Sequence, residues 1–285
     1  MMRLTIQRGH AMTISRRGFV AGAALAAGGL GLLGFEGTPA QAAARPVTVK
    51  YGPSELDIYV PGRSAGRPVL VYVHGGGWIV GNRGDVYSIP DFAARLGLIL
   101  VSVDYRKLPS TSVPWQAKDV AAAINWVRSN IARYGGDPAK MIVLGYSAGA
   151  HLAALTVLDG RAGPVAGLIC HDVGTYDIAA LNRFYDGSMP LLFRNAFPKA
   201  KQWDRLSPAN AIGKAAIPPV LVTWSDVKHH PAMSAVFIEK LRSAGASVET
   251  YDGSRQYSHR DIIRAIAPGA GGVSKAIEGF IAAHV

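Results

Sequence analysis

The chain has 285 residues and one cysteine, Cys170; 49% of its residues are apolar, 17% are charged, and the formal net charge is +11. This length can bury a large core, the composition is that of an ordinary globular protein, and a single cysteine excludes an intrachain disulfide. The basic residues are scattered and are not interleaved with aromatic ones, so we expect no nucleic-acid partner and attribute the charge to solubility and weak steering.

The first 44 residues have the pattern of an export signal. Ser15-Arg16-Arg17-Gly18-Phe19-Val20 resembles a twin-arginine motif, an Ala/Gly/Leu-rich run extends from it to about residue 35, and Ala40-Gln41-Ala42 offers a small-residue cleavage site. The apolar run is short and glycine-rich for a span of about 20 residues, and no cysteine follows it closely, which argues against a stable membrane anchor or a lipoprotein. We therefore expect residues 1–44 to be a signal peptide that contacts the twin-arginine export machinery transiently.

The rest of the chain, residues 45–285, is predicted to be one domain in the periplasm or outside the cell, with a net charge of about +8. Its first apolar run, residues 68–73 (PVLVYV), predicts a buried parallel strand. The strand leads into Gly75-Gly76-Gly77, where the absence of Cβ atoms lets backbone N–H groups approach a ligand. The placement is typical of an oxyanion-binding loop, with Gly76 and Gly77 as donors and Trp78 as a substrate contact. The alternative is a flexible glycine loop.

The clearest helix is predicted from residue 115 to residue 134. Pro114 stands at its start and Gly135-Gly136 at its end, and its apolar residues recur with the helical period at Val120, Ala123, Ile124, Val127 and Ile131. Strand-like runs alternate with helical patterns along the chain, which predicts an α/β fold with a parallel sheet and helices on both faces.

A serine lies between a short apolar strand and an Ala/Leu-rich helix. Met141–Leu144 predicts the strand, and Gly145-Tyr146-Ser147-Ala148-Gly149 matches a nucleophile elbow, which raises the serine hydroxyl above the sheet. Ser147 would lie at a helix N-terminus, where N–H groups favour negative charge, and the Ala148 N–H would be a third oxyanion donor. An ordinary Gly/Ser turn is the alternative, but the glycine loop occurs upstream in the expected order.

The next apolar strand, residues 165–170, ends at His171-Asp172, which we place on the floor of the site without a chemical role. Residues 176–210 form an insertion before the strand at 219–224, and we expect it to act as a short lid. Its large side chains would either bind an apolar group or pack the insertion onto the core: Tyr176, Phe184, Tyr185, Met189, Leu191, Leu192, Phe193, Phe197 and Trp203.

The acid and base of a triad should follow the serine in the order acid, then histidine. Asp226 comes directly after the strand at 219–224 and is the predicted acid, with Glu249, Asp252 and Asp261 as alternatives; a helix N-cap is the other reading of Asp226. His259 lies between a strand (247–251) and a helix beginning near residue 260, and is the predicted base rather than a surface-loop histidine.

His229 and His230 do not predict a metal site. Adjacent residues point apart on a helix or a strand, and no third ligand stands at a familiar spacing. We expect two solvated histidines at the start of a helix.

Four segments carry a resemblance to a known family: His74–Trp78, Val103–Pro109, Gly135–Pro138 and Gly145–His151. With the C-terminal half they cover most of residues 47–285, and the chain resembles α/β-hydrolase serine carboxylesterases of the hormone-sensitive-lipase-like, feruloyl-esterase-like and kynurenine-formamidase-like groups. The resemblance implies the α/β-hydrolase fold, a mostly parallel twisted sheet with a short lid insertion. It also implies a histidine at the position of His259. The chain departs from the family at Trp224-Ser225-Asp226, where a Gly-Asp-type turn is common.

The predicted function is hydrolysis of small-molecule carboxylic esters by Ser147, His259 and Asp226, without a metal or another cofactor. Trp78 and Tyr146 beside the serine favour small to medium or aromatic acyl groups. An arylformamidase-type amidase with the same triad is an alternative, although such relatives tend to carry a bulky residue at the position of Gly77. A non-catalytic binding protein on the same fold is a third.

Overall fold

The computed structural model describes residues 45–62 and 65–285. The predicted signal peptide, residues 1–44, lies outside the described residues. Within the described part, no helix is both long enough and apolar enough to cross a membrane.

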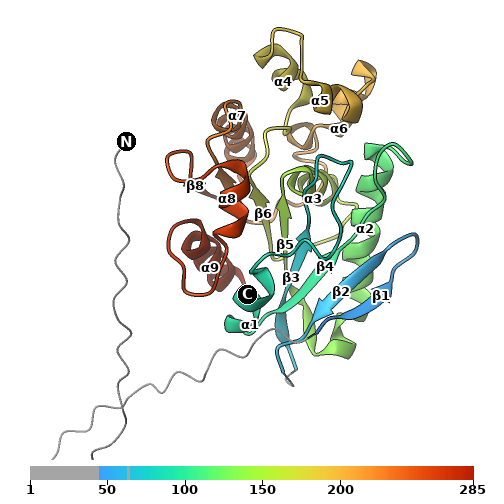
Figure 1. Ribbon diagram of the computed structural model, residues 1–285, viewed down its shortest axis with the longest axis vertical. Helices are drawn as coiled ribbons and strands as arrows, with labels where there is room; N and C mark the ends of the chain where they lie inside the picture. Colours follow the sequence, from blue (N-terminus) through green and yellow to red (C-terminus); the bar gives the residue numbers. More distant parts are fainter. Residues whose placement is uncertain (1–44, 63–64) are drawn as a thin grey trace, which may run out of the picture. The chain divides into compact units, whose positions relative to one another are not determined.

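The described residues form a mixed, mostly parallel sheet of eight strands in the order β1-β2-β4-β3-β5-β6-β7-β8 (Figure 1). The first two strands pair antiparallel to each other, β2 pairs antiparallel to β4, and the remaining pairs are parallel. The strands are β1 (Val47–Lys50), β2 (Glu55–Tyr59), β3 (Arg67–Val73), β4 (Ile99–Val103), β5 (Gly136–Tyr146), β6 (Gly167–His171), β7 (Val220–Trp224) and β8 (Val248–Asp252).

Helices cover both faces of the sheet, as the alternation of strand and helix patterns predicts. They are α1 (Ile89–Arg95), α2 (Val113–Asn130), α3 (Ala148–Leu158), α4 (Ile178–Phe184), α5 (Leu191–Ala196), α6 (Trp203–Leu206), α7 (His230–Ser243), α8 (His259–Arg264) and α9 (Val273–His284). The helix predicted at 115–134 is α2 followed by a 3₁₀ turn at Ile131–Tyr134, and it ends at Gly135 with a φ of +87°.

The alternation of side chains along β3 divides the core into two layers. Val69, Val71 and Val73 pack on one face with α2, α3 and α7. Leu70 and Tyr72 pack on the opposite face with α1, α8 and α9. Because both faces of the sheet are covered, the central strands β4 and β6 are buried at every position, whereas the edge strand β8 is not.

The insertion at 176–210 contains α4, α5 and α6, which lie beyond the edge of the sheet to which the parallel strands point (Figure 1). Most of its large apolar side chains pack onto the core, including Tyr176, Met189 and Phe197. Leu191 and Leu192 are exposed instead. The insertion therefore packs mainly on the core but also presents apolar side chains at the surface.

Candidate active site

Ser147 lies at a sharp turn between β5 and α3 and has a φ of +53°, which is rare for a residue with a side chain. The glycines on either side permit this turn. A Cβ on Gly145 would lie 2.5 Å from the Ala150 Cα, and one on Gly149 would overlap the carbonyls of Val73 and His74. The predicted nucleophile elbow is therefore present in the geometry, packed directly against the end of β3.

His259 begins α8 and faces this serine. Its Nε2 lies 3.0 Å from the Ser147 Oγ, which is hydrogen-bond distance for proton transfer. The Tyr146 hydroxyl donates to the His259 carbonyl at 2.6 Å, and the two rings stack with centroids 5.1 Å apart. Tyr146 thus packs against His259 and is not among the residues that line the cavity beside Ser147. The structure therefore does not place Tyr146 where the predicted substrate contact would be.

The acidic partner of His259 is Asp172, and the prediction of Asp226 is wrong. The His259 Nδ1 lies 2.7 Å from Asp172 Oδ2. Asp226 is exposed, and its backbone N–H donates to the Tyr257 carbonyl. The alternatives have other partners: Glu249 pairs with His284, Asp252 accepts from the Ser254 N–H, and Asp261 bonds the N-cap residue Ser258.

The register of the sheet explains this position of the acid. β6 is the direct neighbour of β5, and His171 pairs with Tyr146, which sets Asp172 level with Ser147. Thr223 of β7 pairs in turn with His171, so Asp226 is one strand farther away and beyond the level of the serine. The sequence does show that Asp172 directly follows an apolar strand. It does not show that this strand, β6, lies next to β5, and that adjacency is what identifies the acid.

The Asp172 carboxylate is fully buried and accepts three hydrogen bonds. Besides His259 Nδ1 it contacts His230 Nδ1 at 2.6 Å, and the Ser225 N–H donates to it at 2.8 Å. Burial opposes ionisation, but the hydrogen bonds from His230 and His259 outweigh it and hold the pKa of the Asp172 carboxyl well below its usual range. The carboxylate is therefore charged at neutral pH.

The prediction that His229 and His230 are solvated is also wrong, because both side chains are buried. His229 Nδ1 lies 3.0 Å from the Tyr185 hydroxyl, and burial lowers the pKa of His229 to about 3. Asp172, His230 and His259 offer ligand atoms within 4.8 Å of one another. The Nδ1 atoms of His230 and His259 lie 2.6 and 2.7 Å from the two oxygens of Asp172. These are hydrogen-bond distances, so the cluster is a carboxylate that is hydrogen-bonded to two imidazoles.

A cavity of about 190 Å³ opens beside Ser147. Gly77 and Ala148 line it, as predicted for donors to an oxyanion, whereas Gly76 does not; the Gly76 carbonyl accepts from the N–H groups of Ile79 and Val80. Trp78 lines it as predicted, and the remaining apolar and histidine contacts include Val173, Leu192, Phe193, Val227, His229 and His230.

The segment after β4 supports the glycine loop. The His74 ring stacks on Tyr105 with centroids 4.5 Å apart, and the Tyr105 hydroxyl donates to the His74 carbonyl. Asp104 accepts from Lys107 at 2.5 Å and lies 3.4 Å from His74 Nε2. Burial opposes its ionisation, but contacts with His74 and Lys107 lower the pKa of Asp104 to about 2.

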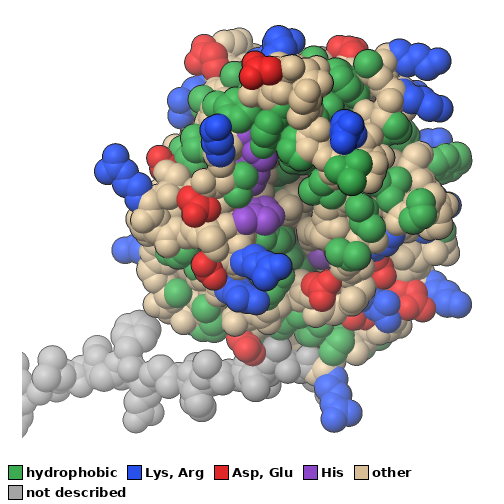
Figure 2. Space-filling view, turned by 45° about the horizontal axis from the view of Figure 1, so that its top comes forward, with side chains coloured by type: hydrophobic (Ala, Val, Ile, Leu, Met, Phe, Trp, Pro, Cys, Tyr) green, Lys and Arg blue, Asp and Glu red, His purple; other side chains and the backbone are tan. Residues whose placement is uncertain are grey.

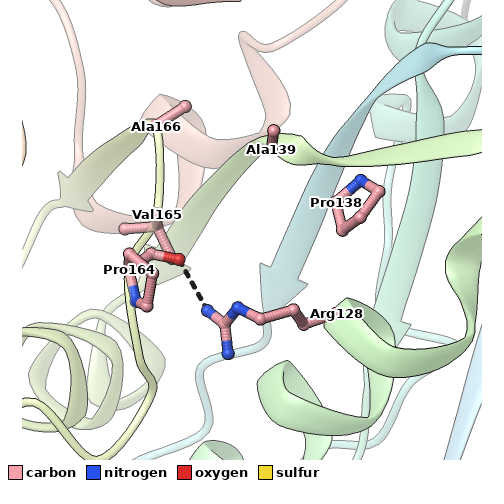
Figure 3. Close-up of a pocket in the computed structure, with 6 residues that line it drawn as sticks. All are labelled: Arg128, Pro138, Ala139, Pro164, Val165 and Ala166. Carbon is pink, nitrogen blue, oxygen red and sulfur yellow. Dashed lines mark hydrogen bonds between the residues drawn. The ribbon is translucent and has the colours of Figure 1, made fainter.

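A larger hollow of about 390 Å³ lies at the opposite edge of the sheet, near the start of β5 (Figure 3). Arg128 lines it and donates to the Pro164 carbonyl at 2.6 Å; the other lining residues are Pro138, Ala139, Pro164, Val165 and Ala166. None of these side chains is a nucleophile or a base, so the cavity at Ser147 is the candidate active site.

Comparisons with known proteins find similarity to esterases. The BD-FAE family model matches residues 56–185. Esterase LipQ of Mycobacterium tuberculosis is 34% identical over 257 residues, and the match covers 80% of this chain and 60% of the relative. Carboxylesterase NlhH of the same organism is 32% identical over 204 residues, and the match covers 64% of this chain and 63% of the relative. The chain thus spans about three fifths of the length of these two relatives.

A thermostable esterase from Pseudomonas putida has a similar structure, with a TM-score of 0.69 and 21% sequence identity; the match covers 87% of this chain and 85% of that one. At this identity the likeness concerns the fold. Together with the strand order and the elbow, it shows that the chain has the α/β-hydrolase fold, as the sequence resemblance implied.

Proposed function

We propose that this protein is a serine carboxylesterase that acts through Ser147, His259 and Asp172. The observation that carries the proposal is the continuous chain of contacts from the Ser147 Oγ through both nitrogens of His259 to a buried carboxylate. Similarity to named esterases supports the same reaction class.

In the proposed reaction the Ser147 Oγ attacks the ester carbonyl while the His259 Nε2 takes its proton. Asp172 holds the Nδ1–H of His259, so that Nε2 keeps a free lone pair, and stabilises the imidazolium that forms. The developing oxyanion accepts hydrogen bonds from the N–H groups of Gly77 and Ala148; each such donor is worth roughly 100- to 1000-fold in rate.

His259 then gives the proton to the departing alcohol, and an acyl group remains on Ser147. A water molecule, deprotonated by His259, attacks this acyl group and releases the acid. As the acid is released, the proton on His259 returns to the Ser147 Oγ and the triad is restored.

The cavity supports an acyl group of small to medium size. Its volume of about 190 Å³ is below the range of roughly 300–1,000 Å³ that is usual for drug-sized ligands. Leu192 restricts it further, because a Cβ on Gly77 would lie 2.9 Å from the Leu192 Cδ1. Acyl groups of up to about eight carbons, or a single aromatic ring, fit this size.

Covalent labelling and steady-state kinetics test the proposal. A fluorophosphonate should add one label, on Ser147, and Ser147→Ala should lower kcat by more than about 10⁴-fold. In a series of p-nitrophenyl esters, kcat/KM should peak at or below about eight carbons, and a matched amide should be slower than its ester. Unimpaired hydrolysis by Ser147→Ala, or a peak at twelve carbons, would contradict the reaction or the substrate size respectively.

We also propose that the protein is exported by the twin-arginine route, on the pattern of residues 1–44. Expression in a bacterial host with and without that route tests this. Mature protein should be found in the periplasm or medium only when the route is intact, and Arg16→Lys with Arg17→Lys should keep the precursor in the cytoplasm.

A further inference from the structure

Exposed apolar side chains gather at the rim of the catalytic cavity. Val80 and Leu191 are 63% and 62% exposed, and Ile79 and Leu192 are exposed beside them. Ile79 and Val80 follow the glycine loop, whereas Leu191 and Leu192 begin α5. Figure 2 shows hydrophobic side chains bordering the hollow in which histidine side chains are visible.

An open groove of about 440 Å³ separates these two segments. Ile79 lines one side of it, and Arg194 and Pro198 line the other. Both segments run from the cavity to the groove: Trp78 and Leu192 line the cavity, whereas Ile79 and Arg194, which follow them closely in the chain, line the groove.

A second hollow of about 440 Å³ shares Pro198 with this groove and is rich in positive charge. Lys118, Lys199 and Arg205 line it together with Trp115, which is 52% exposed. The Lys118 Nζ lies 4.0 Å from the centroid of the Trp115 ring. No acidic residue is among the described residues that line either hollow.

These features form one face, here called the rim face: Ile79, Val80, Leu191, Leu192, Trp115, Lys118, Arg194, Lys199 and Arg205. Five of the eight exposed large apolar side chains of the described residues belong to it, so they are not the scattered singles that are normal on a soluble protein. A soluble ester small enough for the cavity would not reach most of these side chains, and the cations have no balancing acidic residue among the described residues that line the two hollows. A lipid surface matches the combination of leucines, a tryptophan and flanking cations.

We propose that the rim face docks on the surface of an anionic phospholipid bilayer. The leucines and Val80 enter the boundary between headgroups and acyl chains, Trp115 lies at the headgroup level, and the cations contact lipid phosphates. Docking in this way points the cavity at Ser147 toward the lipid, where an apolar ester is most concentrated. The contact is peripheral and needs no membrane-spanning helix in the described part of the chain.

Co-sedimentation of the full chain with vesicles tests the proposal. Vesicles of equal parts phosphatidylglycerol and phosphatidylcholine are compared with pure phosphatidylcholine at low salt, and binding should be at least about 10-fold tighter to the anionic vesicles. Each cation at a membrane surface is worth about fivefold in affinity. The variant Lys118→Glu with Lys199→Glu and Arg205→Glu should therefore bind on the order of 100-fold more weakly.

A second variant removes apolar contacts, Val80→Ser with Leu191→Ser, and should bind about 10-fold more weakly. Matched controls change the same kinds of exposed side chain elsewhere: Lys50→Glu with Lys140→Glu and Lys275→Glu, and Val47→Ser with Val236→Ser. All variants are made in the full chain, so that any contribution of residues 1–44 is common to them.

Hydrolysis of a soluble acetate ester should be the same in all four variants, because none of the changed residues belongs to the proposed triad or its oxyanion donors. That readout shows that each variant is folded and keeps vesicle binding separate from the proposed esterase activity. Equal binding to both kinds of vesicle, or equal losses in rim-face and control variants, overturns the proposal.

Discussion

His230 Nδ1 lies 2.6 Å from one oxygen of Asp172, while His259 Nδ1 contacts the other at 2.7 Å. One buried carboxylate thus serves two imidazoles, of which only His259 reaches the serine. His230 begins α7, directly after the turn that follows β7. Its contact fixes the second oxygen of the carboxylate, and the centroid of its ring lies 5.6 Å from that of the His259 ring.

Replacing His230 therefore tests a positioning role. His230→Ala should lower kcat by about 10- to 100-fold, the usual worth of a hydrogen bond to a charged group, with little change in KM. His230→Asn keeps an N–H near the same position and should restore most of the rate. Steady-state kinetics measures both variants, and equal losses of kcat in His230→Ala and His230→Asn, or a rise in KM with an unchanged kcat, would contradict the positioning role.

The acid of the triad is tested by two matched substitutions. Asp172→Asn should lower kcat on the order of 10⁴-fold, because an amide favours the wrong tautomer of His259. Asp226→Asn should stay within about twofold of the parent, since that side chain is exposed. The two are compared by steady-state hydrolysis of p-nitrophenyl butyrate, and the opposite ranking would contradict the placement of the acid.

The elbow glycine Gly149 should not tolerate a methyl group. Its Cβ would overlap the Val73 and His74 carbonyls, so Gly149→Ala should lower the free energy of unfolding by about 2–4 kcal/mol and reduce fluorophosphonate labelling of Ser147. Gly279 in α9 is the control, because nothing lies within 4 Å of its added Cβ. Gly279→Ala should stabilise the protein by about 0.5–1 kcal/mol. Urea unfolding measures both, and equal effects would contradict the packing described for the elbow.

Buried neutral histidines predict a loss of stability in acid. Burial lowers the pKa of His151 and of His171 to about 4 each, and that of His229 to about 3, against about 6.5 in an unfolded chain. Between these values the unfolded state binds more protons than the folded state, so the free energy of unfolding falls as pH falls from about 6.5 to about 4. The depressed pKa of Asp172 adds a loss in the same direction below about pH 4.

Urea unfolding at pH 7.5, 6.5 and 5 measures this dependence. His171→Asn removes one titrating ring while keeping a polar group near Thr223, which His171 Nδ1 contacts at 2.7 Å. The decrease between pH 6.5 and 5 should be smaller in this variant, by on the order of 1–2 kcal/mol. Parallel curves for variant and parent would show that His171 is not the group that titrates.

The sequence predicted those parts of the site that depend on local structure. The glycine loop after β3 and the serine turn after β5 could both be predicted, because in each case an apolar strand is followed directly by glycines. Glycine is required there because a Cβ atom would collide with the neighbouring backbone. His259 was predictable because its loop joins a strand to a helix and few other histidines were candidates.

The acid was not predictable in the same way, because its position depends on which strands are neighbours. The preference for Asp226 assumed that the strand at 219–224 supplies the acid, whereas β6 is the strand that pairs with β5. The burial of His229 and His230 has the same cause: a helix start is solvated only if no other segment covers it, and here the insertion contributes Tyr185 against His229. Long-range packing, not periodicity, decides both.

Because Asp172, which directly follows β6, is the acid of the proposed triad, the turn after β7 carries no member of that triad. Val227 in this turn lines the cavity, and the Asp226 side chain is exposed. Residues 226–228 can therefore change in size and charge while the contacts from Ser147 to His259 and Asp172 stay as they are. In the proposed esterase, Val227 thus contributes to the cavity from a segment that carries no triad residue, and libraries that vary this turn alone should change acyl selectivity while the triad contacts are kept.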